Sequence, residues 1–189
     1  MHTEYEVRVL DIDKDKLIKK LDKLGAQKIA DFDYKRRVYN FNPAVSHKWI
    51  RLRTDGKKTT LTIKKLESLD IDGTKELEIE VSNFDETNDL LNELGYKSHT
   101  YQENKRTRYV LNDVELDIDS WPYIPTYLEI EGKNEQAVKD MIKLLELDEE
   151  KITSIDVQGV FKTFYNIEIS DVPVVKFDTP LDEKYYIKH

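Results

Sequence analysis

Residues 4–9, EYEVRV, alternate charged and apolar side chains with a period of two. Successive side chains of a β-strand point to opposite faces, so this alternation predicts a strand with one charged and one apolar face. ELEIEV at residues 76–81 and YLEIE at residues 127–131 repeat the pattern. The three segments predict strands whose carboxylates share one face of a sheet.

Further segments with the same period indicate more strands. They are residues 34–41, 49–53, 60–64, 106–109 and 115–119. Asp-Gly at residues 55–56 and Asn-Asp at residues 112–113 stand where tight turns would join two pairs of them as hairpins. The total is roughly eight strands, about the number at which a small barrel closes.

Amphipathic helices are expected after each of the three acidic strands, because apolar residues there recur at helical spacing. Side-chain caps and terminal glycines mark their ends. The expected boundaries are Asp13 or Asp15 with Gly25, Asp85 with Gly95, and a start near Asn134.

These elements predict an α+β fold, a closed antiparallel β-barrel of roughly eight strands with flanking helices. The alternative is an open sheet whose helices cover one face and whose charged face is in water. We expect residues 1–165 to form the barrel domain and residues 166–189 to form a C-terminal arm packed on it.

Composition narrows the possible functions. The net charge of −8 and the isoelectric point of about 5.1 argue against a protein that binds nucleic acid. The chain has no cysteine, which excludes disulfides and cysteine zinc sites, and its four histidines are scattered. No apolar segment approaches the ~20 residues that span a bilayer, and no signal peptide is visible, so we expect a cytoplasmic protein with no membrane partner.

The charged face of the predicted strands is unusual, because strands disfavour Glu and Asp. If all strands point their charges the same way, ten acids and six bases face one another. The acids are Glu4, Glu6, Glu76, Glu78, Glu80, Glu115, Asp117, Asp119, Glu129 and Glu131. The bases are Arg8, Arg51, Arg53, Lys64, Arg106 and Arg108. A solvated face explains any one strand, but the whole set indicates a functional site.

The excess of acids over bases suggests what this site binds. Two divalent cations would cancel four negative charges, and oxygen ligands suit Mg²⁺ or Mn²⁺. The arginines could then hold an anion, because a guanidinium matches phosphate oxygens bidentately. A polyphosphate chain is the expected ligand, provided that the strand register is right.

The same residues form an ordered series of motifs. They are E-x-E-x-R at residues 4–8, R-x-R at 51–53, T-x-K at 62–64, E-x-E at 76–78, R-T-R at 106–108, and Asp119 followed by E-I-E-G at 129–132. The series resembles the CYTH superfamily, the triphosphate tunnel metalloenzymes, which includes class IV adenylyl cyclases, thiamine triphosphatases and inorganic triphosphatases. The resemblance covers roughly residues 1 to 165. The family's hallmark has Lys where this chain has Arg8, and many members have Lys at the position of Arg106.

The resemblance implies a role for each charged residue. The implied metal ligands are Glu4, Glu6, Asp119, Glu129 and Glu131. The implied triphosphate-binding residues are Arg8, Arg51, Arg53, Lys64, Arg106 and Arg108. The implied catalytic residues are Arg106, Tyr39 and Glu78: Tyr39 stands near where some members have a tyrosine that positions water, and Glu78 would orient the bases or the attacking group.

The resemblance favours a metal-dependent triphosphatase that binds two Mg²⁺ or Mn²⁺ ions. Tripolyphosphate, ATP and thiamine triphosphate are all possible substrates, and a homodimer is possible. One alternative is an adenylyl cyclase that converts ATP to cyclic AMP and pyrophosphate. Two non-enzymatic alternatives are a binder of polyphosphate or nucleotide and a scaffold that binds a basic protein.

Overall fold

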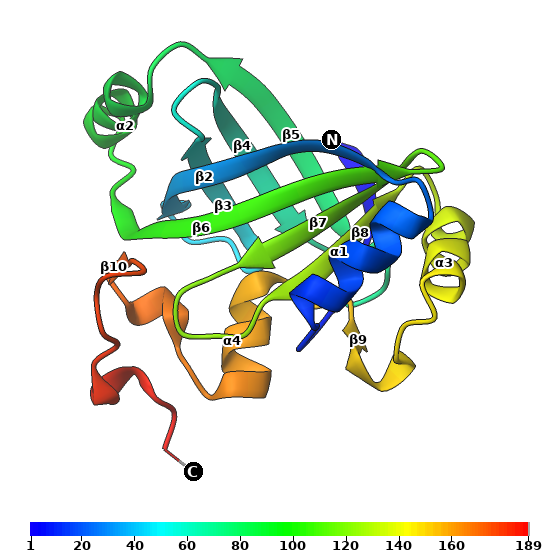
Figure 1. The fold of residues 1–189 in the computed structure, drawn as a ribbon. Helices are drawn as coiled ribbons and strands as arrows, with labels where there is room; N and C mark the ends of the chain where they lie inside the picture. Colours follow the sequence, from blue (N-terminus) through cyan, green and yellow to red (C-terminus); the bar gives the residue numbers. More distant parts are fainter. Residues whose placement is uncertain (189) are drawn as a thin grey trace.

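The computed structural model describes residues 1–188, and its centre is a closed barrel (Figure 1). The eight barrel strands are β1 (His2–Val9), β2 (Gln27–Asn40), β3 (Lys48–Thr54), β4 (Thr59–Leu66), β5 (Thr74–Val81), β6 (Ser98–Leu111), β7 (Val114–Ser120) and β8 (Tyr127–Gly132). They follow the antiparallel order β6-β2-β3-β4-β5-β1-β8-β7, and β7 pairs back to β6. The predicted closed barrel is confirmed, and the open sheet is wrong.

Two short strands add to this barrel. β9 (Ile152–Thr153) pairs with β1, and β10 (Val174–Val175) lies parallel to β6. The strand predicted at residues 34–41 is the second half of the longer β2, which pairs with β6 from Gln27 to Tyr39 and with β3 only from Lys35 onward.

Helices flank the barrel as predicted. The α-helices are α1 (Lys14–Lys23), α2 (Phe84–Glu93), α3 (Glu135–Leu144) and α4 (Val157–Tyr165), and the 3₁₀ helices are η1 (Glu149–Lys151), η2 (Ile169–Asp171) and η3 (Glu183–Tyr185). Asp13 and Asn134 cap α1 and α3. The predicted cap Asp85 is wrong, because the side chain of Asn83 accepts the first free backbone N–H groups of α2.

The apolar outer faces of several strands pack against these helices, whereas Leu77 and Ile79 on β5 are exposed. α1 and α3 cover the wall formed by β1, β7 and β8, where Leu21, Leu116 and Met141 are buried (Figure 1). α2 places Leu91 against Tyr39 and Leu52 on another part of the wall. The apolar faces therefore point outward to the helices, which leaves the charged faces to line the lumen.

α4 and the chain after it lie at one end of the barrel (Figure 1). Phe161 of α4 packs edge-on against Trp121, and Ile169 and Val175 join the same apolar cluster. The predicted C-terminal arm runs through this region, apart from residue 189, which lies outside the described residues. No helix within residues 1–188 is long and apolar enough to cross a membrane.

Candidate functional site

The lumen has a basic half and an acidic half. It forms a cavity of about 1000 Å³ into which all eight strands and the start of α4 project side chains. The adjacent strands β6, β2, β3 and β4 supply Arg36, Arg51, Arg53, Lys64, Arg106 and Arg108. The other four strands supply Glu4, Glu6, Glu76, Glu78, Glu115, Glu129 and Glu131, with Arg8 among them. The order of the strands around the barrel thus separates the two signs of charge.

Ion pairs join the two halves where β4 meets β5. Lys64 Nζ lies 2.9 Å from oxygens of both Glu4 and Glu76. Arg51 makes longer contacts, of 3.5 Å to Glu76 and 3.4 Å to Glu78. Burial alone would raise the pKa of Glu76, but Lys64 and Arg51 lower it to about 2.

The second junction, where β6 meets β7, is more tightly paired. Arg106 contacts Asp117 and Asp119 at 2.5 Å each and Glu129 at 2.9 Å. Burial alone would lower the pKa of Arg106, but these three carboxylates raise it well above its usual value. Arg108 contacts Asp117 at 2.6 Å. The guanidinium of Arg106 is thus already occupied by protein carboxylates.

This pairing bears on the expected roles of Arg106 and Asp119. Asp119 is fully buried, and its oxygens accept hydrogen bonds from Asn104 and Arg106. It is absent from the lining of the cavity, so the structure gives it no open ligand position. Arg106 is a permanent cation and cannot accept a proton. Arg106 thus bridges Asp119 and Glu129, and the predicted catalytic role of Arg106 and metal-binding role of Asp119 stay predictions.

Arg36 is a buried lumen cation that was not among the predicted site residues. Its Nη2 donates to Asn104 Oδ1, and its guanidinium lies 4.5 Å from the Trp121 ring centroid. It forms no ion pair within residues 1–188, and burial together with Arg51 and Arg53 lowers its pKa well below the usual value. Residues 35–37 read KRR, so the sequence alone does not show which of the three bases points inward.

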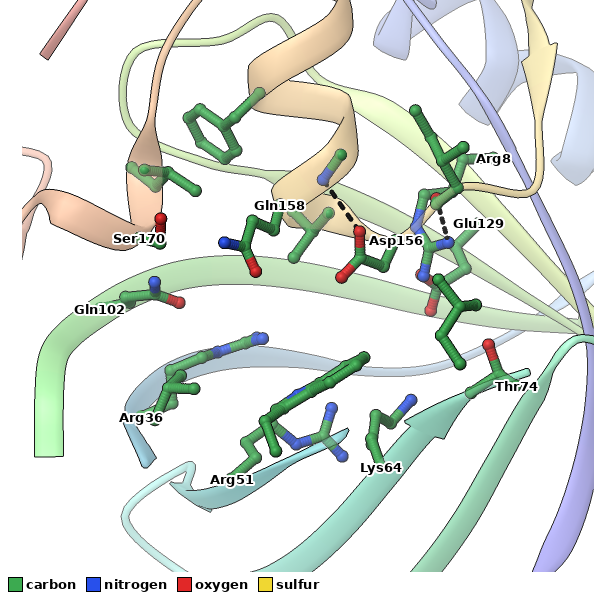
Figure 2. A pocket seen from close by; sticks show the side chains of 18 of the residues that line it. Arg8, Arg36, Arg51, Lys64, Thr74, Gln102, Glu129, Asp156, Gln158 and Ser170 are labelled. Carbon is green, nitrogen blue, oxygen red and sulfur yellow. Dashed lines mark hydrogen bonds and ion pairs between the residues drawn. The ribbon is translucent and has the colours of Figure 1, made fainter. Parts of the chain in front are cut away.

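Arg36, Arg51 and Arg53 form what we call the arginine cluster. Figure 2 shows Arg36 and Arg51 facing the cavity on the same side as Lys64. Arg53 has a single distant carboxylate, Glu78 at 3.8 Å, and its guanidinium lies 4.5 Å from the Tyr34 ring. Burial, followed by Arg51 and Arg106, lowers the pKa of Arg53 to about 10. The cluster is therefore a concentration of positive charge with too few acids to balance it.

Glu4, Glu6 and Glu131 form the opposing acidic cluster. Burial raises the pKa of Glu131 to about 8, and the nearby Glu129, Glu4 and Glu6 add to the effect. Burial also raises the pKa of Glu4 to about 7, although Lys64 opposes the change. Glu131 has no ion-pair partner among the described residues. These carboxylates need more positive charge than their neighbours supply.

Arg8 lies between the acidic half and α4. It contacts Glu129 at 2.7 Å and Glu6 at 3.2 Å, and its Nη1 donates to the backbone carbonyl of Ile155 at 2.8 Å. Figure 2 shows Arg8 and Glu129 beside Asp156, at the start of α4. Arg8 therefore links the lumen to the helix at its end, and its predicted contact with triphosphate stays a prediction.

The acidic cluster fits a divalent cation by its chemistry. Its oxygens are the hard ligands that Mg²⁺ and Mn²⁺ prefer. The raised pKa values of Glu4 and Glu131 indicate that nearby cations do not balance these carboxylates, and a divalent ion would supply the positive charge. No group of three acidic or histidine side chains in residues 1–188 is already arranged to hold a metal. Lys64 on Glu4 and Arg8 on Glu6 occupy oxygens that a cation would use. Glu4, Glu6 and Glu131 are the residues that would hold it.

Of the predicted catalytic residues Tyr39 and Glu78, the structure places only Glu78 in the lumen. Tyr39 lies outside the lumen, because it pairs with the outward Ile50 on β3 and its hydroxyl donates to Asn88 of α2 at 2.9 Å. Its hydroxyl therefore lies away from the lumen cavity, where the predicted role in positioning water would require it to be. Glu78 does line the cavity, where it accepts from Thr62 at 2.8 Å and contacts Arg51.

The fold and the site define a closed β-barrel protein whose lumen is divided into a basic and an acidic half. Among such barrels the chain belongs to the CYTH domain family, whose pattern matches residues 2–164. A comparison with curated protein sequences returns no match.

Solved structures share the fold at low identity. Protein PH1012 of Pyrococcus horikoshii OT3 has a TM-score of 0.72 and 23% identity, over 81% of this chain and 96% of its own. A Vibrio parahaemolyticus protein proposed to be an adenylate cyclase has a TM-score of 0.73 and 10% identity, over 85% of this chain and 98% of its own. A third similar structure is a Hippeastrum protein proposed to be an adenylyl cyclase, with a dominant triphosphatase activity. It has a TM-score of 0.59 and 15% identity, over 86% of this chain and 96% of its own.

Proposed function

We propose that this chain is a metal-dependent triphosphatase that binds its substrate's phosphates between the arginine cluster and the acidic cluster. The arginine cluster carries the proposal, because Arg36 has no carboxylate partner among the described residues and Arg53 has only a distant one. Buried cations without a counter-ion are costly. A triphosphate supplies the missing acceptors, and guanidinium groups bind phosphate oxygens in pairs.

The same arrangement suits phosphoryl transfer. This reaction depends mainly on positioning and on stabilising negative charge, which Arg36, Arg51 and Arg53 supply. Glu78 positions Arg51 and Arg53 through its two contacts. A divalent cation held by Glu4, Glu6 and Glu131 would act as a Lewis acid on phosphate oxygens.

Membership of the CYTH family supports a triphosphate substrate, and the activity of the Hippeastrum protein supports hydrolysis. The adenylyl cyclase and the non-catalytic binder are the competing outcomes of the test below. Cyclisation would need the ribose 3′-hydroxyl as nucleophile in place of water.

Product analysis tests the proposal with tripolyphosphate and with ATP, each in Mg²⁺ and in Mn²⁺. We expect phosphate release that is lost in the Glu4→Gln/Glu6→Gln variant. Glu103→Gln is the matched control, because Glu103 accepts from Tyr101 and does not line the lumen cavity. Cyclic AMP and pyrophosphate from ATP would establish the cyclase instead. Thermal stabilisation by tripolyphosphate without turnover would leave only a binder.

A further inference from the structure

A second cavity, of about 210 Å³, extends the lumen. Arg53, Glu78 and Arg108 line both cavities, so the two meet at these residues. Along β3 the large cavity is lined from Lys48 to Arg53 and the small cavity by Arg53, and residues of α4 line only the large cavity. The extension therefore leads from the arginine cluster away from α4.

Two aromatic side chains distinguish the small cavity from the rest of the lumen. Phe32 and Tyr34 are two residues apart on β2, and both line it. Their rings are parallel, with an interplanar angle of 7° and centroids 5.3 Å apart. Both side chains are partly exposed. We call them the ring pair.

The strand pairing keeps one side of the ring pair open. The pairing of β2 with β3 starts at Lys35, so residues 27–34 pair with β6 alone among the barrel strands. The turn between β3 and β4 lies opposite and contributes Asp55 and Lys58 to the cavity. The ring pair therefore borders an open space. The two rings are stacked on each other and Arg53 stands over the Tyr34 ring at 4.5 Å, so the ring face that neither of these contacts covers belongs to Phe32.

We propose that the ring pair stacks with the base of a nucleoside triphosphate whose phosphates lie on the arginine cluster. The inference rests on the proposed function and deepens it by naming the substrate class. Aromatic side chains bind nucleobases through their faces and do so for any base. Arg53 joins the two parts of the site, because it lines both cavities and contacts Tyr34.

Calorimetric titration in Mg²⁺ tests this with two ligands that resist hydrolysis. Adenosine 5′-(β,γ-imido)triphosphate carries the base, and diimidotriphosphate carries the phosphate chain alone. We expect wild-type protein to bind the adenosine compound at least about tenfold more tightly, which lies within the usual range for base stacking. In the Phe32→Leu/Tyr34→Leu variant the ratio of the two affinities should fall below about twofold. Its affinity for diimidotriphosphate should stay within about threefold of the wild-type value.

Two variants control for folding and for general aromatic loss. Tyr34→Phe retains a ring and should keep the advantage. Phe177→Leu removes an exposed aromatic that also has a cation nearby, Lys105 at 5.3 Å, but lies outside both cavities, and it should change neither affinity. Thermal unfolding of each variant confirms that it is folded.

The outcomes separate this inference from the proposed function. If wild-type protein binds diimidotriphosphate but gains nothing from adenosine, the ring-pair inference is wrong and the triphosphatase proposal stands. The inference is also wrong if the advantage survives the double variant, or if both ligands weaken equally, which would mean that the rings only support Arg53. If neither ligand binds wild-type protein, both proposals fail.

Discussion

Two buried arginines of the lumen, Arg36 and Arg106, have opposite surroundings. Arg106 contacts three carboxylates, which raise its pKa, whereas burial and neighbouring arginines lower the pKa of Arg36. Removing a buried charge that is paired leaves its partner charges uncompensated and destabilises the protein. Removing a buried charge that has no counter-ion eliminates a desolvation cost and stabilises it. Replacing the two residues should therefore change stability in opposite directions.

We expect Arg36→Met to stabilise the ligand-free protein by about 1 kcal/mol and to weaken tripolyphosphate binding at least about tenfold. Denaturant unfolding and calorimetric titration measure the two effects. Arg37→Met is the matched control, because Arg37 follows on β2, lies over the Tyr101 ring and does not line the cavity. A less stable variant with unchanged affinity would show that Arg36 is structural.

Arg106→Met should cost about 3–5 kcal/mol of unfolding free energy, because Asp117, Asp119 and Glu129 lose their shared partner. The same denaturant measurement gives the value. A loss of less than about 1 kcal/mol would contradict the view that Arg106 is held by the protein's own acids.

At the scale of elements, β2 shows what the sequence could and could not predict. The period of two predicted its second half as a strand, but period alone does not give register between strands. The pairing of Val38 with Arg51 places Arg36 inward and Tyr39 outward. The charges of β1, β3 and β8 were predictable because they alternate with apolar residues, whereas the basic run at residues 35–37 conceals the alternation. The pairing of Arg106 with Asp119 depends on cross-strand register, so composition could not show that the two neutralise each other.

α4 is the element whose attachment to the barrel can be tested directly. The side chain of Asp156 caps it by accepting from the backbone N–H of Gly159 at 2.8 Å. Asp156→Ala should cost about 1 kcal/mol and speed hydrogen exchange in α4 while β6 and β7 stay protected. Asp156→Asn keeps an acceptor and should behave nearly as wild type. Equal exchange in both variants would mean that the cap does not hold α4.

The whole barrel separates charge, and this separation makes stability depend on pH. Glu4 and Glu131 have folded-state pKa values of about 7 and about 8, above the ordinary carboxyl value. Between about pH 5 and pH 8 the folded protein therefore binds more protons than the unfolded chain, so its stability falls as pH rises through this range.

We expect the metal-free protein to lose on the order of 3 kcal/mol between pH 5 and pH 8. Glu131→Gln should flatten this dependence, and Mg²⁺ should stabilise the wild type more at pH 8 than at pH 5, because a cation competes with protons for the same oxygens. Thermal or denaturant unfolding across this range measures both effects. An identical pH dependence in Glu131→Gln would contradict the assignment of Glu131.

The most direct test of a lumen that binds triphosphate between two charged clusters is a crystal structure with diimidotriphosphate and Mn²⁺. We predict phosphate density in contact with Arg36, Arg51 and Arg53, and anomalous scattering from Mn²⁺ beside Glu4, Glu6 and Glu131. Phosphate and metal bound only outside the barrel, or an empty lumen at saturating ligand, would contradict this account.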